Sequence, residues 1–247
     1  MKNNLQTKLK AILLLLMLIP FLGIGQTKNV ISTSRVFPKA DKQLEFEKAL
    51  AAHAQKYHTG DVKWRVLDIV TGPDAGGYQI TEGPKSWESE DVRGDINVEH
   101  NNDWHKSVTI YLTDRNSNGY SVYIDSLSTI AIGDYSDKVQ LTHIYPKLGC
   151  SYRVATMIKQ LKAAWAAEGS TIAVYEVNGS GAPQFVVATR YKQGLKEKTD
   201  GFRKSFVDTY EKIHGKGSWA IFNDNVKEYY SDVWRELLFY RADLSSK

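Results

Sequence analysis

The sequence contains little cysteine, few prolines and only a small excess of charge. One cysteine, Cys150, occurs in 247 residues, which excludes an intramolecular disulfide framework and a cysteine-rich zinc or iron–sulfur site. Common nucleotide-binding and hydrolase motifs are also missing, because there is no GxGxxG after a strand, no P-loop, no GxSxG and no HExxH. We therefore expect no cofactor. Hydrophobic residues nevertheless make up 42% of the chain, which is enough for a folded core.

Residues 1–25 have the composition of a secretory signal peptide. Residues 1–10 contain three lysines and no acid, and the apolar run AILLLLMLIPFL at 11–22 is followed by small residues. A membrane span needs ~20 apolar residues, so an uncleaved anchor is the weaker alternative, together with a buried helix. Cleavage lowers the formal charge from +4 to +1, which does not favour nucleic-acid binding. We expect bacterial export, either to the periplasm or to the medium, with no membrane contact after cleavage.

The remaining chain contains two related halves. Three segments of the first half resemble, in order, three segments of the second half at an offset of about 108 to 110 residues. The first alignment places Arg35 on His143. The second places Asp68 on Glu176. The aligned pairs are ISTSRVFPKADKQLEFEKAL with VQLTHIYPKLGCSYRVATMI, VLDIVTGPDAGGYQI with VYEVNGSGAPQFVV, and NGYSVYIDSLSTIAIG with KEYYSDVWRELLFYRAD.

Each half predicts the element order β-α-β-β-α-β, which is the ferredoxin-like arrangement. Apolar residues of the second half recur at helical spacing from Val154 to Trp165. A ferredoxin-like sheet carries helices on one face, so its other face must be covered. The expected class is α+β: two tandem repeats, 26–135 and 136–247, that pack sheet to sheet as a pseudo-dimeric α/β barrel. The expected strands are 30–37, 63–71, 77–82, 127–133, 139–145, 171–178, 184–191 and 236–242.

This arrangement resembles the dimeric α/β-barrel superfamily, which includes the antibiotic-biosynthesis monooxygenases, here as a tandem fusion. The resemblance covers residues 30–243 and rests on the order of the elements. It implies that a small, mostly apolar molecule or haem binds between the sheet and the helices, and that cofactor-free oxygenase chemistry is available to some members. The haem-degrading branch uses Asn, Trp and His side chains in a set arrangement, which we do not find in this sequence.

The leading hypothesis combines the two observations: residues 1–25 predict export, and the resemblance implies that the protein binds a small, largely apolar molecule. Cofactor-independent oxygenase or isomerase activity is left open by this hypothesis. The alternative is a non-catalytic structural or interaction module of the cell envelope, because a fold does not determine a function. We expect an intramolecular pseudo-dimer, which leaves assembly into a homo-oligomer open, and we expect no nucleic-acid partner.

Four polar residues at equivalent strand positions form the first candidate site. Arg35 and His143 belong to the first strands of the two halves, and Asp68 and Glu176 belong to the second strands. Because one strand separates them in a ferredoxin-like sheet, the basic and acidic groups would lie ~10 Å apart, which suits a bound polar ligand. The alternative is that these side chains face solvent or pair elsewhere.

A second candidate site is the segment DRNSNGYSVYID at 114–125, which has the spacing of a calcium loop. The candidate ligands are Asp114, Asn116, Asn118 and Asp125. The last position usually carries a bidentate glutamate, and strand-like residues flank the segment. A surface hairpin that turns at Asn118-Gly119 is therefore the favoured alternative.

Histidine pairs are the third feature. His53 and His58 are five residues apart, as are His100 and His105. Residues five apart on a helix point about 140° away from each other, so neither pair has the usual metal-binding geometry. We expect solvated helix histidines, with Trp104 and His105 as a pair that could line a ligand pocket.

Overall fold

The computed structural model describes residues 27–93 and 96–247. The expected signal peptide, residues 1–25, lies outside the described residues. Within the described ranges, no helix combines the length and the apolar content that a bilayer-crossing helix requires.

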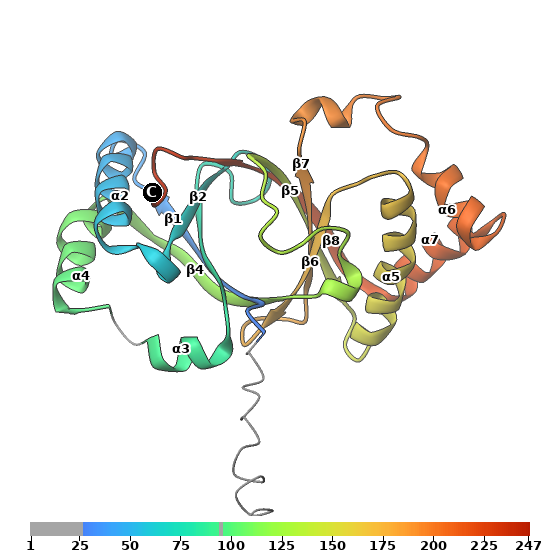
Figure 1. Ribbon diagram of the computed structural model, residues 1–247, viewed down its shortest axis with the longest axis horizontal. Coiled ribbons are helices and arrows are strands. Elements are labelled where there is room, and N and C mark those ends of the chain that lie inside the picture. The colour runs from blue at the N-terminus through green and yellow to red at the C-terminus, as the bar shows by residue number, and fades with distance from the viewer. Residues whose placement is uncertain (1–26, 94–95) are drawn as a thin grey trace, which may run out of the picture.

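Eight antiparallel strands form a closed barrel in the order β1-β3-β2-β8-β5-β7-β6-β4 (Figure 1). Each half contributes four neighbouring strands, and the halves join where β2 pairs with β8 and β4 pairs with β6. Closure leaves no free sheet edge, so every strand has a partner on both sides. The strands are β1 (Val30–Pro38), β2 (Trp64–Ile69), β3 (Tyr78–Lys85), β4 (Leu112–Tyr123), β5 (Lys138–Pro146), β6 (Ile172–Asn178), β7 (Phe185–Tyr191) and β8 (Tyr230–Tyr240).

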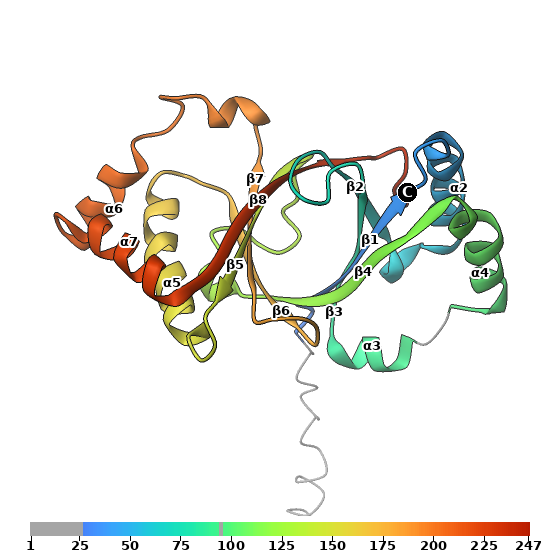
Figure 2. The ribbon, with the colours of Figure 1, turned by 180° about the vertical axis from the view of Figure 1, so that it is seen from behind.

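Helices cover two opposite sides of the barrel, one set from each half (Figures 1 and 2). On the first side, α2 buries Phe46 and Leu50 completely against the sheet. On the second side, α5 does the same with Val154 and Ile158, which confirms the predicted helix face. The helices are α2 (Gln43–Tyr57), α3 (Trp87–Arg93), α4 (Val98–Asp103), α5 (Ser151–Ala167), α6 (Phe206–His214) and α7 (Ser218–Tyr229).

Strand alternation separates the barrel interior from the two helix-covered surfaces. On β1, Thr33 and Arg35 point into the barrel, whereas Val36 packs in the cluster that includes Phe46 of α2. The same period of two holds on β5, where Leu141 and His143 line the interior and Ile144 packs with residues of α5. The barrel therefore has an inner core of its own, distinct from the apolar layers under the helices.

The last strand of each half differs from the sequence-based prediction. Ser117 of β4 lies opposite Arg35, and Trp234 of β8 lies opposite His143, so Ser117 and Trp234 are the equivalent residues. The predicted offset near 110 would equate Ser117 with Lys227, so the third segment alignment is wrong. Two helices, α6 and α7, precede β8 and lengthen this crossover. The predicted strand 127–133 is also wrong, because β4 at Leu112–Tyr123 is the last strand of the first half.

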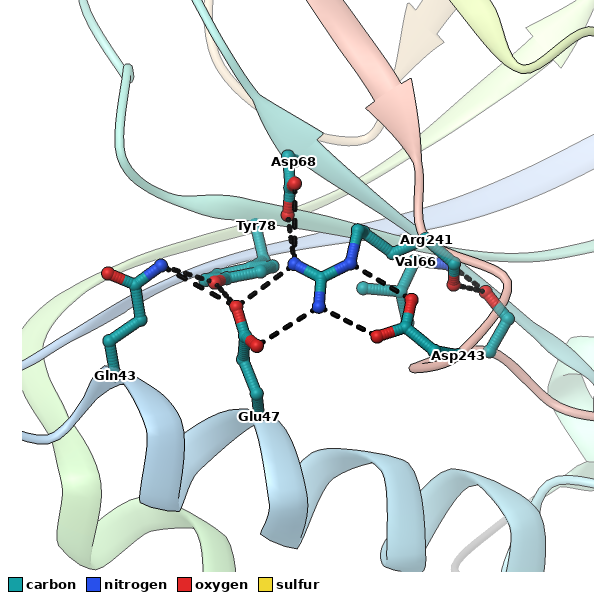
Figure 3. Close-up of polar contacts among 8 residues, drawn as sticks. Gln43, Glu47, Val66, Asp68, Tyr78, Arg241 and Asp243 are labelled. Carbon is teal, nitrogen blue, oxygen red and sulfur yellow. Dashed lines mark hydrogen bonds and ion pairs between the residues drawn. The ribbon is translucent and has the colours of Figure 1, made fainter.

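The chain end returns from β8 to the first half and is anchored there by Arg241 (Figure 3). The guanidinium donates to both carboxylate oxygens of Glu47 on α2, each at 3.0 Å, and to Asp243 at 2.7 Å. It also reaches Asp68 on β2 at 3.3 Å. The backbone N–H of Arg241 donates to the carbonyl of Val66 at 2.9 Å. These contacts fasten the C-terminal segment to the N-terminal half.

Candidate functional site

A cavity of about 550 Å³ lies inside the barrel, and side chains from all eight strands line it. Its middle is apolar, and polar groups gather toward both ends. His143 lies toward one end of β5 and Val139 toward the other, four residues or ~13 Å apart. The apolar lining consists mainly of Ile31, Leu67, Val139, Leu141, Val177 and Val186.

A buried ion cluster forms the first polar end. Arg35 on β1 donates to Glu236 on β8 at 2.5 Å, to Gln79 on β3 at 2.8 Å and to Asp74 at 2.6 Å. Arg35 is 8% exposed and Glu236 is 1% exposed, so both charges have lost most of their hydration. A buried carboxylate is stable only when it is paired, and Arg35 supplies that pairing.

His143 extends the same cluster from β5. Its Nε2 lies 2.8 Å from Glu236 Oε1, and its Nδ1 lies 2.6 Å from the amide nitrogen of Gln184. Because the amide donates, Nδ1 accepts and Nε2 carries the proton that it donates to Glu236. The ring also stacks on Trp234 with centroids 3.8 Å apart. His143 thus has a fixed orientation with Nδ1 on the side of Gln184, which lines the cavity.

Two arginines and a tyrosine form the second polar end. Arg190 is fully engaged, because it donates to the carbonyls of residues 131, 132 and 134 and to Tyr175 Oη at 2.6 Å. Arg65 lies between the rings of Tyr135 and Tyr240, at 4.1 and 4.2 Å from their centroids. Among the described residues, no carboxylate forms an ion pair with Arg65. Burial accordingly lowers the pKa of the Arg65 guanidinium from its usual value.

The four polar residues predicted from the repeat divide between the inside and the outside of the barrel. Arg35 and His143 both line the cavity, and Glu236 connects them. Asp68 points to the α2 side of the sheet, where it pairs with Arg241. Glu176 is exposed on β6. The structure therefore brings the two basic residues together and leaves both predicted acids away from them.

The predicted calcium segment is an extended strand. Residues 112–123 form one continuous strand, so the expected hairpin turn at Asn118-Gly119 is wrong. Asp114 and Asn118 are four residues apart on this strand, or ~13 Å, which is too far for both to bind one ion. Asp125 lies beyond the strand, near Tyr123 Oη at 3.2 Å. The structure does not bring the four predicted ligands together.

A second cavity, of about 750 Å³, lies outside the barrel between the first half's sheet and its helical segment. Trp104 lines this cavity, as does His100, but His105 is exposed and does not. His53 and His58 are only 1% and 0% exposed, so the expectation of solvated histidines is wrong for this pair. Burial lowers the pKa of His53 to about 4, against the opposing effect of a hydrogen bond to Asp103.

Several residues of the barrel site were not predicted from the sequence. Glu236 and Trp234 lie on a strand whose register the third alignment misplaced by several residues. With the correct register, Glu236 would stand out as an acid among inward-facing apolar positions of β8. Arg65 carries no such signal, because an arginine beside a tryptophan is ordinary at a strand's end. The residues missed are Arg65, Asp74, Gln79, Gln184, Trp234 and Glu236.

Solved structures share this architecture. A Lactobacillus acidophilus NCFM protein described as a candidate monooxygenase superposes with a TM-score of 0.52 at 9% identity, over 88% of this chain and 95% of that chain. An anthrone oxidase-like protein superposes with a TM-score of 0.55 at 10% identity, over 87% and 92%. A candidate monooxygenase from Fusobacterium nucleatum subsp. nucleatum ATCC 25586 gives 0.52 at 14% identity, over 85% and 91%.

The chain has the dimeric α/β-barrel fold. The three neighbours, the closed eight-stranded barrel and the helices on two sides all agree with the predicted class. No known family profile matches the sequence, and no curated protein matches it either. At such low identity the likeness establishes the fold alone, so the function must be argued from the site.

Proposed function

We propose that this protein binds a small, largely apolar molecule with one anionic end inside its barrel. The observation that carries the proposal is the cavity of about 550 Å³ inside the closed barrel. Ligand cavities usually exceed ~300 Å³ and combine apolar walls with a few converging polar groups. A purely structural module of the cell envelope, the alternative, would fill this space with side chains.

The two polar ends supply different interactions. At the first end, Arg35 already has Glu236 and Asp74 as partners, so its charge is balanced. At the second end, Arg65 is held between two tyrosine rings, and no carboxylate within residues 27–93 and 96–247 forms an ion pair with it. A ligand carboxylate, sulfonate or enolate would complete its hydrogen bonds, because guanidinium donors bind such groups in a bidentate manner. We assign the anionic end of the ligand to Arg65 and its apolar body to the middle of the cavity.

Cofactor-independent oxygenase or isomerase chemistry is a second candidate function, supported by the orientation of His143. A base near neutral pH must present a lone pair to the substrate, and the Nδ1 of His143 carries one. Gln184 covers this atom at 2.6 Å, so its side chain would have to move when a substrate binds. Two of the structural neighbours are described as candidate monooxygenases and one as anthrone oxidase-like. Loss of turnover with retained binding in His143→Gln would support this function.

The binding proposal is tested with the fluorescent aromatic sulfonate ANS as a probe. Ser121 is a half-buried residue of β4 that lines the cavity. Ser121→Trp fills part of the space and should abolish binding, whereas Ser121→Thr at the same position should retain it. Arg65→Met should weaken binding at least tenfold, because a charge-assisted hydrogen bond is worth ~1.5–3 kcal/mol.

A surface arginine serves as the control for charge. Arg153 is exposed on α5, away from the cavity lining, and Arg153→Met should leave the affinity unchanged. Equal binding by the wild type and Ser121→Trp would place the probe outside the barrel and contradict the proposal.

Export is a separate part of the proposal. The charged, apolar and small-residue regions of residues 1–25 support cleavage before Gln26. Expression of the full chain in a bacterium, followed by fractionation and N-terminal sequencing, should find a mature protein that begins at Gln26. Recovery of an uncut chain in the cytosol would contradict export and would leave the cavity argument unaffected.

A further inference from the structure

Three histidine rings converge outside the barrel, on the α2 side of the first half. His53 lies in the last turns of α2, His58 directly follows that helix, and His100 lies on α4. One ring nitrogen from each lies within 4.8 Å of the other two. The Nε2 atoms of His58 and His100 are 3.2 Å apart. Three separate segments of the chain therefore aim imidazole nitrogens at one point.

Each of the three rings has an acceptor at its Nδ1. The Nδ1 of His53 lies 2.7 Å from the carboxylate of Asp103. The Nδ1 of His58 lies 3.2 Å from the backbone carbonyl of Val62, and that of His100 lies 3.0 Å from the side-chain oxygen of Asn101. These acceptors hold the proton on Nδ1, which leaves the Nε2 lone pairs on the converging side.

The Nε2 atom of His53 has no hydrogen-bond partner although it is buried. A buried polar atom without a partner is rare and needs an explanation such as an absent ion. The Nε2 atoms of His58 and His100, 3.2 Å apart, form an N–H···N hydrogen bond if one ring carries its proton there, and with both protons on Nδ1 they present two lone pairs that a cation would bridge. A cation at the convergence point would give the Nε2 atom of His53 a partner and would bridge the other two.

We propose that His53, His58 and His100 bind one divalent transition-metal ion through their Nε2 atoms. Tetrahedral bonds of 2.0–2.1 Å place two nitrogen ligands ~3.3 Å apart, and the pair at 3.2 Å already has this spacing. The largest separation, 4.8 Å, closes to this value with a shift of about 1.5 Å, within reach of side-chain rotation. Imidazole ligands favour Zn²⁺, Cu²⁺, Ni²⁺ or Fe²⁺ over the harder Ca²⁺ and Mg²⁺.

The surroundings fit a cation that keeps one open coordination position. His100 lines the outer cavity of about 750 Å³, so the fourth position would face that space. The carboxylate of Asp103 orients His53, and Glu82 Oε2 lies 3.3 Å from His58 Nδ1. Such carboxylate–histidine contacts raise ligand basicity in metal sites. Three histidines and an open position are typical of catalytic zinc sites, in which the ion acts as a Lewis acid.

The site is independent of the barrel cavity, so the two proposals can fail separately. The full chain, stripped with a chelator, is titrated with Co²⁺ and followed by visible absorption, and with Zn²⁺ by calorimetry. We expect one equivalent of each metal and the intense absorption of tetrahedral Co²⁺. Because Asp103 acts through His53, Asp103→Asn should weaken Zn²⁺ binding 10- to 100-fold.

Two histidine variants provide the decisive comparison. His100 is half-buried, and His100→Ala should weaken Zn²⁺ binding at least 100-fold, whereas the exposed His105→Ala should bind like the wild type. An unchanged circular dichroism spectrum and an unchanged urea-unfolding transition would show that His100→Ala is folded. If it does not fold, His100→Gln takes its place. Three results would overturn the proposal. The folded His100 variant could bind Zn²⁺ with wild-type affinity, His105→Ala could lose as much Zn²⁺ affinity as His100→Ala, or the wild type could fail to bind one equivalent of Zn²⁺.

Discussion

The buried Arg35–Glu236 pair gives the sharpest prediction about stability. Glu236 lies with its side chain fully buried, and its charge is balanced by Arg35 at 2.5 Å. In Arg35→Leu, His143 at 2.8 Å is the one side-chain partner that this carboxylate keeps within the described part of the chain. Removal of one member of a buried ion pair costs ~3–5 kcal/mol, and the retained contact places the expected loss near the lower limit, at about 3 kcal/mol.

Substitution of the other member of the pair, Glu236, is expected to cost less free energy of unfolding. In Glu236→Leu, Arg35 keeps Asp74 at 2.6 Å and Gln79 at 2.8 Å, so its charge remains paired. We expect a loss of about 2 kcal/mol, mostly from the hydrogen bond that His143 no longer makes. The double variant leaves no orphaned carboxylate at position 236. Its loss should therefore fall short of the sum of the single losses by at least ~1 kcal/mol.

Urea unfolding, followed by tryptophan fluorescence and circular dichroism, measures the free energy of unfolding of the two single variants and of the double variant. Arg153→Leu, at an exposed position of α5, is the control and should change stability by less than ~0.5 kcal/mol. A loss below ~1 kcal/mol in Arg35→Leu, or losses that simply add in the double variant, would refute the view that this pair is a coupled, buried cluster.

Three further predictions concern the outer layers of the fold. Leu50→Ala, at a fully buried position of α2, should cost ~2–5 kcal/mol in urea unfolding, whereas Leu44→Ala on the same helix, at 79% exposure, should cost less than ~0.5. The hydrogen bond from Arg241 lowers the pKa of Glu47 in the folded protein. The ionised Glu47 carboxylate therefore stabilises the fold above about pH 4.3, the ordinary pKa of glutamate, and this stabilisation is lost as pH falls through the lowered pKa of the folded state. Glu47→Gln should therefore flatten the acid side of a stability–pH curve measured by urea unfolding. Millimolar calcium should leave the thermal midpoint unchanged, because Asp114 lies on an extended strand.

The barrel and the inward position of Arg35 and His143 could be predicted because the repeat keeps its register through the first strand. Strand alternation then places both residues on the same face of equivalent strands, and closure turns that face inward. The acids Asp68 and Glu176 were paired with them by the same argument. On the second strand of each half, the alternation of side chains places positions 68 and 176 on the outer face, so Asp68 and Glu176 face outward.

The β4 strand could not be recognised from its own residues. Residues 114–119, DRNSNG, have low strand propensity and contain a strong turn signal at Asn118-Gly119. Pairing with β1 on one side and β6 on the other supplies the backbone hydrogen bonds that keep this polar segment extended. Tertiary context thus overrides local preference here.

The histidine cluster was missed for a geometric reason. The argument from a 140° separation assumes that both residues lie on one helix, but α2 ends at Tyr57 and His58 follows it with non-helical backbone angles. The chain turns there, and His58 is free to face the same point as His53. His100 joins them from α4, more than forty residues later, which no local pattern could indicate.

A co-crystal structure with ANS is the most direct test of the central claim, that the ligand site lies within the barrel. We predict that the aromatic rings lie among Leu67, Leu141 and Val186, with the sulfonate at Arg65. ANS found only in the outer cavity beside Trp104, or only on the protein surface, would contradict the account.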